Sequence, residues 1–227
     1  MMRDYRVTHH ELLKRLEAGN RRFVDATTID RTLELEYTRK LLAKDGQKPW
    51  AVMIGCSDSR VPIEKVFDAG LGDLFVIRLA GNCMDGGSLG SVEFAVDSFD
   101  IGLVLLIGHK NCGAVTAAHD SCAKSHSPHM DLLFSRIRMA SKYRRKAGDS
   151  LDLAKAEKAN IEYWKDYIRQ NSEFLRSREL SGKTLLCSAY YDTFTGNVQF
   201  LDVDSYNLPG TDLSFRSDVL NGAEVLN

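Results

Sequence analysis

Short apolar runs alternate along the chain with longer segments in which apolar residues recur at helical spacing. Three of these runs have the length of a buried strand: 50–54, 74–78 and 103–107. The segment 88–97, between the second and third run, has the spacing of a helix whose packed face would hold Leu89, Val92, Phe94 and Val96. Strand, helix and strand at this pitch predict a parallel sheet covered by helices on both faces.

The chain before and after this region is mostly helical by the same criterion. Thr8 and Glu11 fit a capping box, and the apolar spacing that follows predicts a helix over about 8–24. Further helices are expected over about 32–44 and throughout 131–178, and further strands over 184–189 and 198–201. These elements predict one α/β domain, with a helical arm at 1–45, a core at 46–202 and a tail at 203–227.

The composition is that of an ordinary globular protein. The 227 residues are 44% hydrophobic and 27% charged, and the net charge of -1 favours neither a nucleic acid nor a membrane surface as partner. The first residues lack a signal-peptide core, and no unbroken apolar run reaches about 18 residues, so we expect a cytoplasmic protein. In a reducing compartment its five cysteines are expected to be core residues, metal ligands or nucleophiles.

Three potential metal ligands follow two of the expected strands. Cys56 comes directly after the first strand, and His109 and Cys112 come after the third. Because the carboxyl ends of parallel strands meet at one edge of a sheet, these side chains are expected to converge. Two thiolates and one imidazole suit Zn²⁺, and three protein ligands leave one position open, as in catalytic zinc sites. The alternatives are plain core packing of each cysteine and redox pairing of Cys56 with Cys112, although no C-x-x-C motif favours the pairing.

Asp58 and Arg60 stand beside the first of these ligands. Zinc with two thiolates and a neutral imidazole has a formal charge near zero, so its bound water would be less acidic than on an all-histidine zinc. A carboxylate that accepts a hydrogen bond from the resulting hydroxide would help such a site, and a cation would keep that carboxylate ionised. Asp58 and Arg60 can supply both functions, and the alternative is a surface ion pair of little energetic value.

The two motifs around these residues, C-S-D-S-R at 56–60 and G-H-K-N-C-G at 108–113, resemble those of the β-class carbonic anhydrases. Three further segments resemble the same family in the same order: 17–23, 72–82 and 188–196. The similarity runs from about residue 8 to residue 202, and the paired motifs are highly specific. The resemblance implies an α/β fold with a mostly parallel central sheet flanked by helices, and N-terminal helices that extend onto a partner subunit.

The resemblance also implies a role for each residue that matches a family position. Cys56, His109 and Cys112 would bind one Zn²⁺ per subunit, and Asp58 and Arg60 would form a catalytic dyad. The residues implied to line the substrate pocket are Gln47, Phe75, Phe94 and Gly113. Family members often supply this glutamine across a subunit boundary.

The implied activity is that of a zinc lyase: reversible hydration of CO₂ to bicarbonate and a proton, by attack of zinc-bound hydroxide on CO₂. The implied assembly is a homodimer or homotetramer. Phe94 stands where plant-type members have a tyrosine, and Leu79 where an asparagine is common. Met53 replaces the tryptophan of members that close their site with bicarbonate bound, which favours an open site without that regulation.

Two other functions fit parts of the same pattern. A hydrolase of CS₂ or carbonyl sulfide on the same scaffold would keep the zinc and the dyad, and would differ in how its pocket is reached. A non-catalytic zinc protein would need a fourth ligand, for which Cys83, Cys122, Asp58 and the surface histidines are the candidates. A free Asp58–Arg60 pair would argue against this second alternative.

Overall fold

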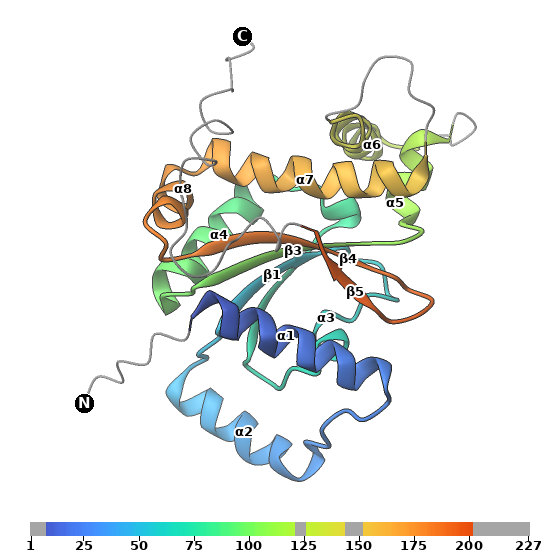
Figure 1. The fold of residues 1–227 in the computed structure, drawn as a ribbon. Helices are drawn as coiled ribbons and strands as arrows, with labels where there is room; N and C mark the ends of the chain where they lie inside the picture. Colours follow the sequence, from blue (N-terminus) through green and yellow to red (C-terminus); the bar gives the residue numbers. More distant parts are fainter. Residues whose placement is uncertain (1–7, 121–125, 144–151, 202–227) are drawn as a thin grey trace.

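A five-stranded sheet forms the centre of the molecule (Figure 1). The computed structural model describes residues 8–120, 126–143 and 152–201. The strands are β1 (Ala51–Gly55), β2 (Leu74–Arg78), β3 (Leu103–His109), β4 (Leu185–Tyr191) and β5 (Val198–Phe200). Their order in the sheet is β2-β1-β3-β4-β5. The first four are parallel and β5 runs antiparallel to β4, which confirms the predicted α/β class with a mostly parallel sheet.

Helices cover both faces of this sheet (Figure 1). They are α1 (His9–Val24), α2 (Thr32–Asp45), α3 (Ile63–Val66), α4 (Gly86–Phe99), α5 (Gly113–His119), α6 (Pro128–Ser141), α7 (Leu153–Asn171) and α8 (Glu173–Leu180), with a 3₁₀ turn, η1, at Ala80–Asn82. α1 and α3 pack on one face, and α4, α7 and α8 pack on the other. None of the described helices is long and apolar enough to cross a membrane.

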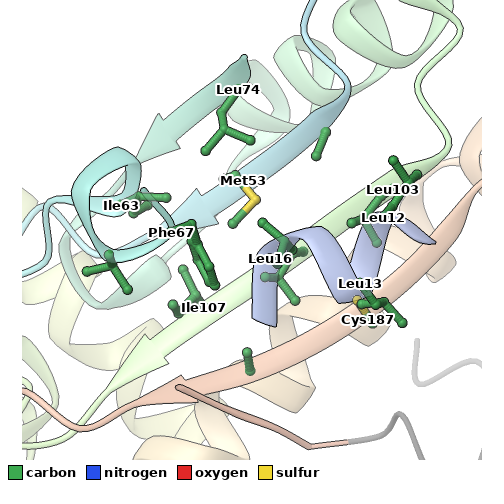
Figure 2. Packing of buried hydrophobic residues seen from close by; sticks show 14 of the residues in the cluster. Leu12, Leu13, Leu16, Met53, Ile63, Phe67, Leu74, Leu103, Ile107 and Cys187 are labelled. Carbon is green, nitrogen blue, oxygen red and sulfur yellow. The ribbon is translucent and has the colours of Figure 1, made fainter. Parts of the chain in front are cut away.

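The central strands β1, β3 and β4 are buried along their whole length. Successive residues of a strand point to opposite faces of the sheet, so each strand supplies two cores. Met53 and Leu105 belong to the core beneath α1 and α3, part of which Figure 2 shows, whereas Val52 and Ile54 belong to the core beneath α4 and α7. Burial on both faces explains why these strands are unbroken apolar runs in the sequence.

Helix α1 belongs to the core of its own chain. Thr8 and Glu11 exchange the hydrogen bonds of a capping box, as the sequence predicts. Leu16 is fully buried against the sheet (Figure 2). A Cβ on Gly19 would lie 2.0 Å from the carbonyl oxygen of Phe67, so a glycine is needed for this approach. By contrast, α2 contributes no buried residue, and its extension onto a partner subunit stays a prediction.

The expected helical stretch 131–178 is divided in the structure. Ser172 ends α7, and its Oγ accepts a hydrogen bond from the backbone N–H of Leu175 in the first turn of α8. This side-chain hydrogen bond favours the start of a new helix over continuation of the preceding helix. The expectation of one helical region was therefore wrong at this point.

The packed face of α4 also differs from the prediction. Leu89, Val92 and Val96 are buried as expected, but Phe94 is 56% exposed. Phe94 is two residues after Val92, which places it about 200° around the helix from that side chain. Its ring lies instead over Phe75 and Phe99, with centroids 6.4 Å and 6.1 Å away. The prediction that Phe94 lies on the packed face was wrong.

Asp68 joins the N-terminal part of the chain to the segment that follows α3. Its side chain is 2% exposed and accepts hydrogen bonds from Arg22 at 2.5 Å and from Arg31 at 2.6 Å. Burial by itself would raise the pKa of Asp68, but the hydrogen bonds from Arg31 and Arg22 outweigh burial and lower it. The ionised carboxylate therefore stabilises the attachment of α1 and of the chain leading to α2.

We expect Asp68→Asn to lower the free energy of unfolding at pH 7 by about 2 kcal/mol, because it leaves two guanidinium groups without their carboxylate. Asparagine tolerates the backbone here, where φ is 45°. Because folding lowers the pKa of Asp68, its contribution is complete above the ordinary carboxyl pKa and is lost as the pH falls through the folded-state value. Urea titrations should therefore show the difference from wild type shrinking between pH 7 and about pH 3.

The matched control is Glu36→Gln, which removes an ion pair between Glu36 and Lys40, two side chains that are 72% and 68% exposed. Exposed pairs of this kind contribute little, so no change above about 0.5 kcal/mol is expected. An equal loss of unfolding free energy in both variants would contradict the stabilising role of the ionised Asp68. So would a loss in Asp68→Asn that does not depend on pH.

Candidate metal centre

The structure brings Cys56, His109 and Cys112 together at the carboxyl ends of two neighbouring strands. β1 and β3 are adjacent and parallel, with Gly55 paired to Ile107. Cys56 directly follows β1, His109 is the last residue of β3, and Cys112 is the N-cap of α5. The potential ligand atoms of all three lie within 4.8 Å of one another, and all three residues are buried. The convergence expected from the strand ends is therefore present.

His109 presents one ring nitrogen to this group. Its Nδ1 lies 3.1 Å from the carbonyl oxygen of Lys110, a contact that places the proton on Nδ1. Its Nε2 is buried and has no hydrogen-bond partner in the part of the chain that the structure describes. A buried nitrogen lone pair without a partner is costly for a folded protein, and binding to a cation would satisfy it.

The two thiols are in hydrogen-bonding contact. The Sγ atoms of Cys56 and Cys112 are 3.9 Å apart. The pKa of Cys56 is lowered, chiefly because the Cys112 thiol donates a hydrogen bond to its sulfur, and the same contact together with burial raises the pKa of Cys112. Burial alone would lower the pKa of His109, but the neighbouring Cys56 raises it. A dication bound here would displace the thiol protons, because a metal binds cysteine as a thiolate.

Asp58 and Arg60 form a two-pronged ion pair at the edge of this group. Arg60 donates from Nε to Oδ1 of Asp58 at 3.0 Å and from Nη2 to Oδ2 at 2.7 Å, and its backbone N–H also donates to Oδ1 at 2.9 Å. These hydrogen bonds lower the pKa of Asp58 to about 2. Oδ2 lies 3.9 Å from Nε2 of His109. The carboxylate thus stays ionised and faces the ligand group from one fixed position.

Two residues outside the predicted set also contact the centre. Arg78 donates to the carbonyl oxygens of Cys56, at 3.0 Å, and of Asp58, at 2.6 Å. Its place at the end of β2 could have indicated this role, because β2 is paired with β1. Glu157 of α7 accepts a hydrogen bond from the backbone N–H of Cys112. No sequence feature links Glu157 to the motifs, since it lies 45 residues farther along the chain.

Of the four expected pocket residues, Gly113 lies next to the ligand group. It is the first residue of α5, directly after Cys112, and it is exposed. A Cβ added to Gly113 would meet no atom within 4 Å, so there is open space at this point.

The other three expected pocket residues lie away from the three candidate metal ligands of the same chain. Phe75 pairs with Val52, the second residue of β1, which is about 13 Å along the strand from the level of Cys56. Phe94 packs on Phe75, and Gln47 is exposed between α2 and β1. The structure of a single chain therefore does not join Gln47, Phe75 and Phe94 to the site.

The donor set fits a zinc ion. Two thiolates and one imidazole are the ligands of known catalytic zinc sites, and three protein ligands leave a position for water or substrate. Among the described residues, the group contains no fourth cysteine, histidine or carboxylate. Cys122, one candidate for a fourth ligand, lies outside the described residues. Cys83 is half-buried and packs nearby without joining the group.

Comparison with known proteins identifies a family to which the sequence of this chain is similar. Residues 51–198 match the sequence model of a family described as carbonic anhydrase. Carbonic anhydrase 2 of Mycobacterium tuberculosis is 47% identical over 105 residues, which are 46% of this chain and 50% of that protein. The chain thus matches about half the length of this curated relative.

Solved structures show the same fold. The β-carbonic anhydrase CafA of Aspergillus fumigatus matches with a TM-score of 0.65 and 24% identity, over 92% of this chain and 97% of that chain. A β-carbonic anhydrase of Sordaria macrospora, described as tetrameric, matches with a TM-score of 0.63 and 20% identity, over 75% of this chain and 89% of that chain.

Proposed function

Because this chain belongs to the β-class carbonic anhydrase family, we propose that it catalyses the reversible hydration of CO₂ to bicarbonate and a proton, with one Zn²⁺ per subunit. The observation that carries the proposal is the arrangement at the carboxyl ends of β1 and β3. There, Cys56, His109 and Cys112 form a buried three-donor group beside an ionised carboxylate. Core packing of the cysteines does not account for the orphaned His109 nitrogen at the same point.

The three donors would hold the metal, and the dyad would direct the reacting water. When bound, Zn²⁺ acts as a Lewis acid that lowers the pKa of water and so supplies the nucleophile. Asp58 would accept a hydrogen bond from that nucleophile and turn its lone pair toward the carbon of CO₂. Arg60 keeps Asp58 ionised and in place through its two parallel hydrogen bonds, and is itself held by the carbonyl oxygen of Asn111 at 3.0 Å.

The substrate would enter through the open space beside Gly113, and a second copy of the chain would complete the pocket. Gln47, Phe75 and Phe94 lie away from the metal group of their own chain, so they could line only the pocket of a neighbouring subunit. The α2 helix supports such an assembly, because it has no buried residue and exposes apolar side chains, among them Leu33 at 96% and Tyr37 at 70%. We therefore propose a homodimer or homotetramer.

The test of this proposal is zinc analysis of the purified protein together with stopped-flow measurement of CO₂ hydration. We expect about one zinc per chain and hydration far above the buffer rate at both pH 7 and pH 9. Removal of zinc with a chelator should abolish hydration, and addition of zinc should restore it. Zinc at full occupancy without CO₂ hydration at either pH would overturn the proposed activity, and hydrolysis of CS₂ or carbonyl sulfide by that protein would identify the alternative.

A further inference from the structure

A buried carboxylate lies directly behind one of the three donors. Glu157 is on α7 and is 3% exposed. Its Oε1 accepts a hydrogen bond of 2.8 Å from the backbone N–H of Cys112, and its Oε2 accepts one from the hydroxyl of Tyr190 on β4. Glutamate is almost never this buried unless it has a specific partner. Here one partner is the backbone of a candidate metal ligand.

The hydrogen bond from Cys112 secures a turn that is under conformational constraint. Asn111, just before Cys112, has a φ of 56°, in the left-handed region that non-glycine residues seldom adopt. Cys112 itself is 4% exposed, so its N–H has no access to water. Without Glu157 this buried donor would be unsatisfied, and the turn could relax in a way that moves the Cys112 sulfur.

Tyr190 holds the carboxylate in the orientation that this turn requires. Burial raises the pKa of Tyr190, and its hydrogen bond to Glu157 raises it further, so the hydroxyl remains a donor at any physiological pH. With a donor on each oxygen, Glu157 acts only as an acceptor, which is the behaviour of an ionised carboxylate. Two contacts from different elements, β4 and the turn before α5, fix the side chain between them.

The negative charge of Glu157 also favours binding of a dication at the three donors. A negative charge beside two thiolates makes the group more attractive to a dication, and the low polarity of the surroundings strengthens this effect. In metal sites, groups that hold the ligands commonly change metal affinity by about 10- to 100-fold when they are removed.

We propose that Glu157, oriented by Tyr190, is a positioning residue that fixes the Cys112 ligand and tightens the hold of the site on its dication. The inference rests on the proposed function for the identity of the metal, Zn²⁺. It extends that function to a helix outside both sequence motifs.

The experiment measures zinc affinity and zinc release, together with the visible spectrum of the Co²⁺-substituted protein, in three variants. Glu157→Ala removes both hydrogen bonds and the charge. Glu157→Gln keeps an oxygen that can accept from Cys112 but loses the charge. Tyr190→Phe keeps the carboxylate and removes the group that orients it.

Glu162→Ala is the matched control. Glu162 is also on α7 and also binds a β4 side chain, accepting a hydrogen bond of 2.5 Å from the hydroxyl of Ser188. It has no hydrogen bond to Cys56, His109 or Cys112 among the described contacts. Its removal is expected to lower the melting temperature without changing zinc release.

Glu157→Ala is expected to weaken zinc binding by about 10- to 100-fold, and to alter the thiolate-to-Co²⁺ charge-transfer band. Glu157→Gln and Tyr190→Phe are expected to weaken it by about 3- to 10-fold, and both should release zinc faster than wild type. If Glu157→Ala does not fold, these two variants decide the matter. Zinc affinity within about twofold of wild type in all folded variants would overturn the inference.

Two results separate this inference from the proposed function. Wild-type protein that binds zinc and hydrates CO₂, with variants that release zinc at the wild-type rate, would overturn the role of Glu157 alone. Wild-type protein that binds no zinc would overturn the proposed function and the inference with it. An equal effect of Glu162→Ala on zinc release would show that Glu157 acts only through general stability.

Discussion

Cys112→Ser is expected to lose its metal and to hydrate CO₂ at least about 10³-fold more slowly than wild type. A serine hydroxyl stays protonated near neutral pH and is a poor ligand for zinc, whereas the cysteine sulfur binds as a thiolate. Only three donors converge here among the described residues, so the loss of one leaves Cys56 and His109 alone. Zinc content and stopped-flow hydration, measured on the same preparation, check both parts of the prediction.

Cys83→Ser is the control for this change. Cys83 is also a thiol near the site, but it is half-buried and outside the group of converging donors. Its pKa is raised by burial, as expected for a packing cysteine. The control should keep its zinc and hydrate CO₂ within about threefold of wild type. A Cys112→Ser protein that retains one zinc and hydrates CO₂ at the wild-type rate would show that the reaction does not depend on this ligand.

Asp58→Asn is expected to keep its zinc and to lower kcat/KM for CO₂ by about 10²- to 10³-fold. Asparagine has nearly the same shape, but its amide nitrogen cannot accept the hydrogen bond that Arg60 donates from Nη2. The side chain therefore loses both its charge and its fixed orientation beside His109. Because Asp58 is not among the three converging donors, the metal content should not change.

The dependence of this loss on pH tests the resting state of the site. Arg60 lowers the pKa of Asp58 to about 2, so the carboxylate of the wild type is ionised throughout the range from pH 6 to pH 9. A lowered pKa means that only strong acid protonates the group, and the ratio of wild-type to variant activity should be constant across that range. If Asp58 instead moved onto the metal at lower pH, the ratio would fall toward pH 6.

Asp192→Asn provides the matched control for Asp58→Asn. Asp192 also pairs with a cation near the ligand group, since its Oδ2 lies 3.0 Å from Nζ of Lys110. The Asp192 side chain is more exposed than that of Asp58, 27% against 15%, and Asp192 does not contact the three donors, so its loss should change kcat/KM by less than about threefold. A loss as large in Asp192→Asn as in Asp58→Asn would contradict the special role of the Asp58–Arg60 pair.

The local elements of this protein follow from local chemistry, and most were predictable. The capping box of Thr8 and Glu11 marks the start of α1. The strands β1, β2 and β3 follow apolar runs in the sequence to within two residues. The failures also have local causes: Ser172 divides a helical region by capping α8, and Phe94 lies on a face of α4 that its own chain leaves exposed.

The strand–helix alternation, the two motifs and the donor types of the metal group can be read from the sequence, because they depend on neighbouring residues. Only the tertiary structure placed β1 beside β3, which brings Cys56 to 3.9 Å from Cys112 across 56 positions of the chain. It also placed Glu157 of α7 behind Cys112, and it separated Phe75 from the metal group of the same chain. Such contacts depend on the order of strands in the sheet and on the packing of helices across it, and no local spacing encodes either.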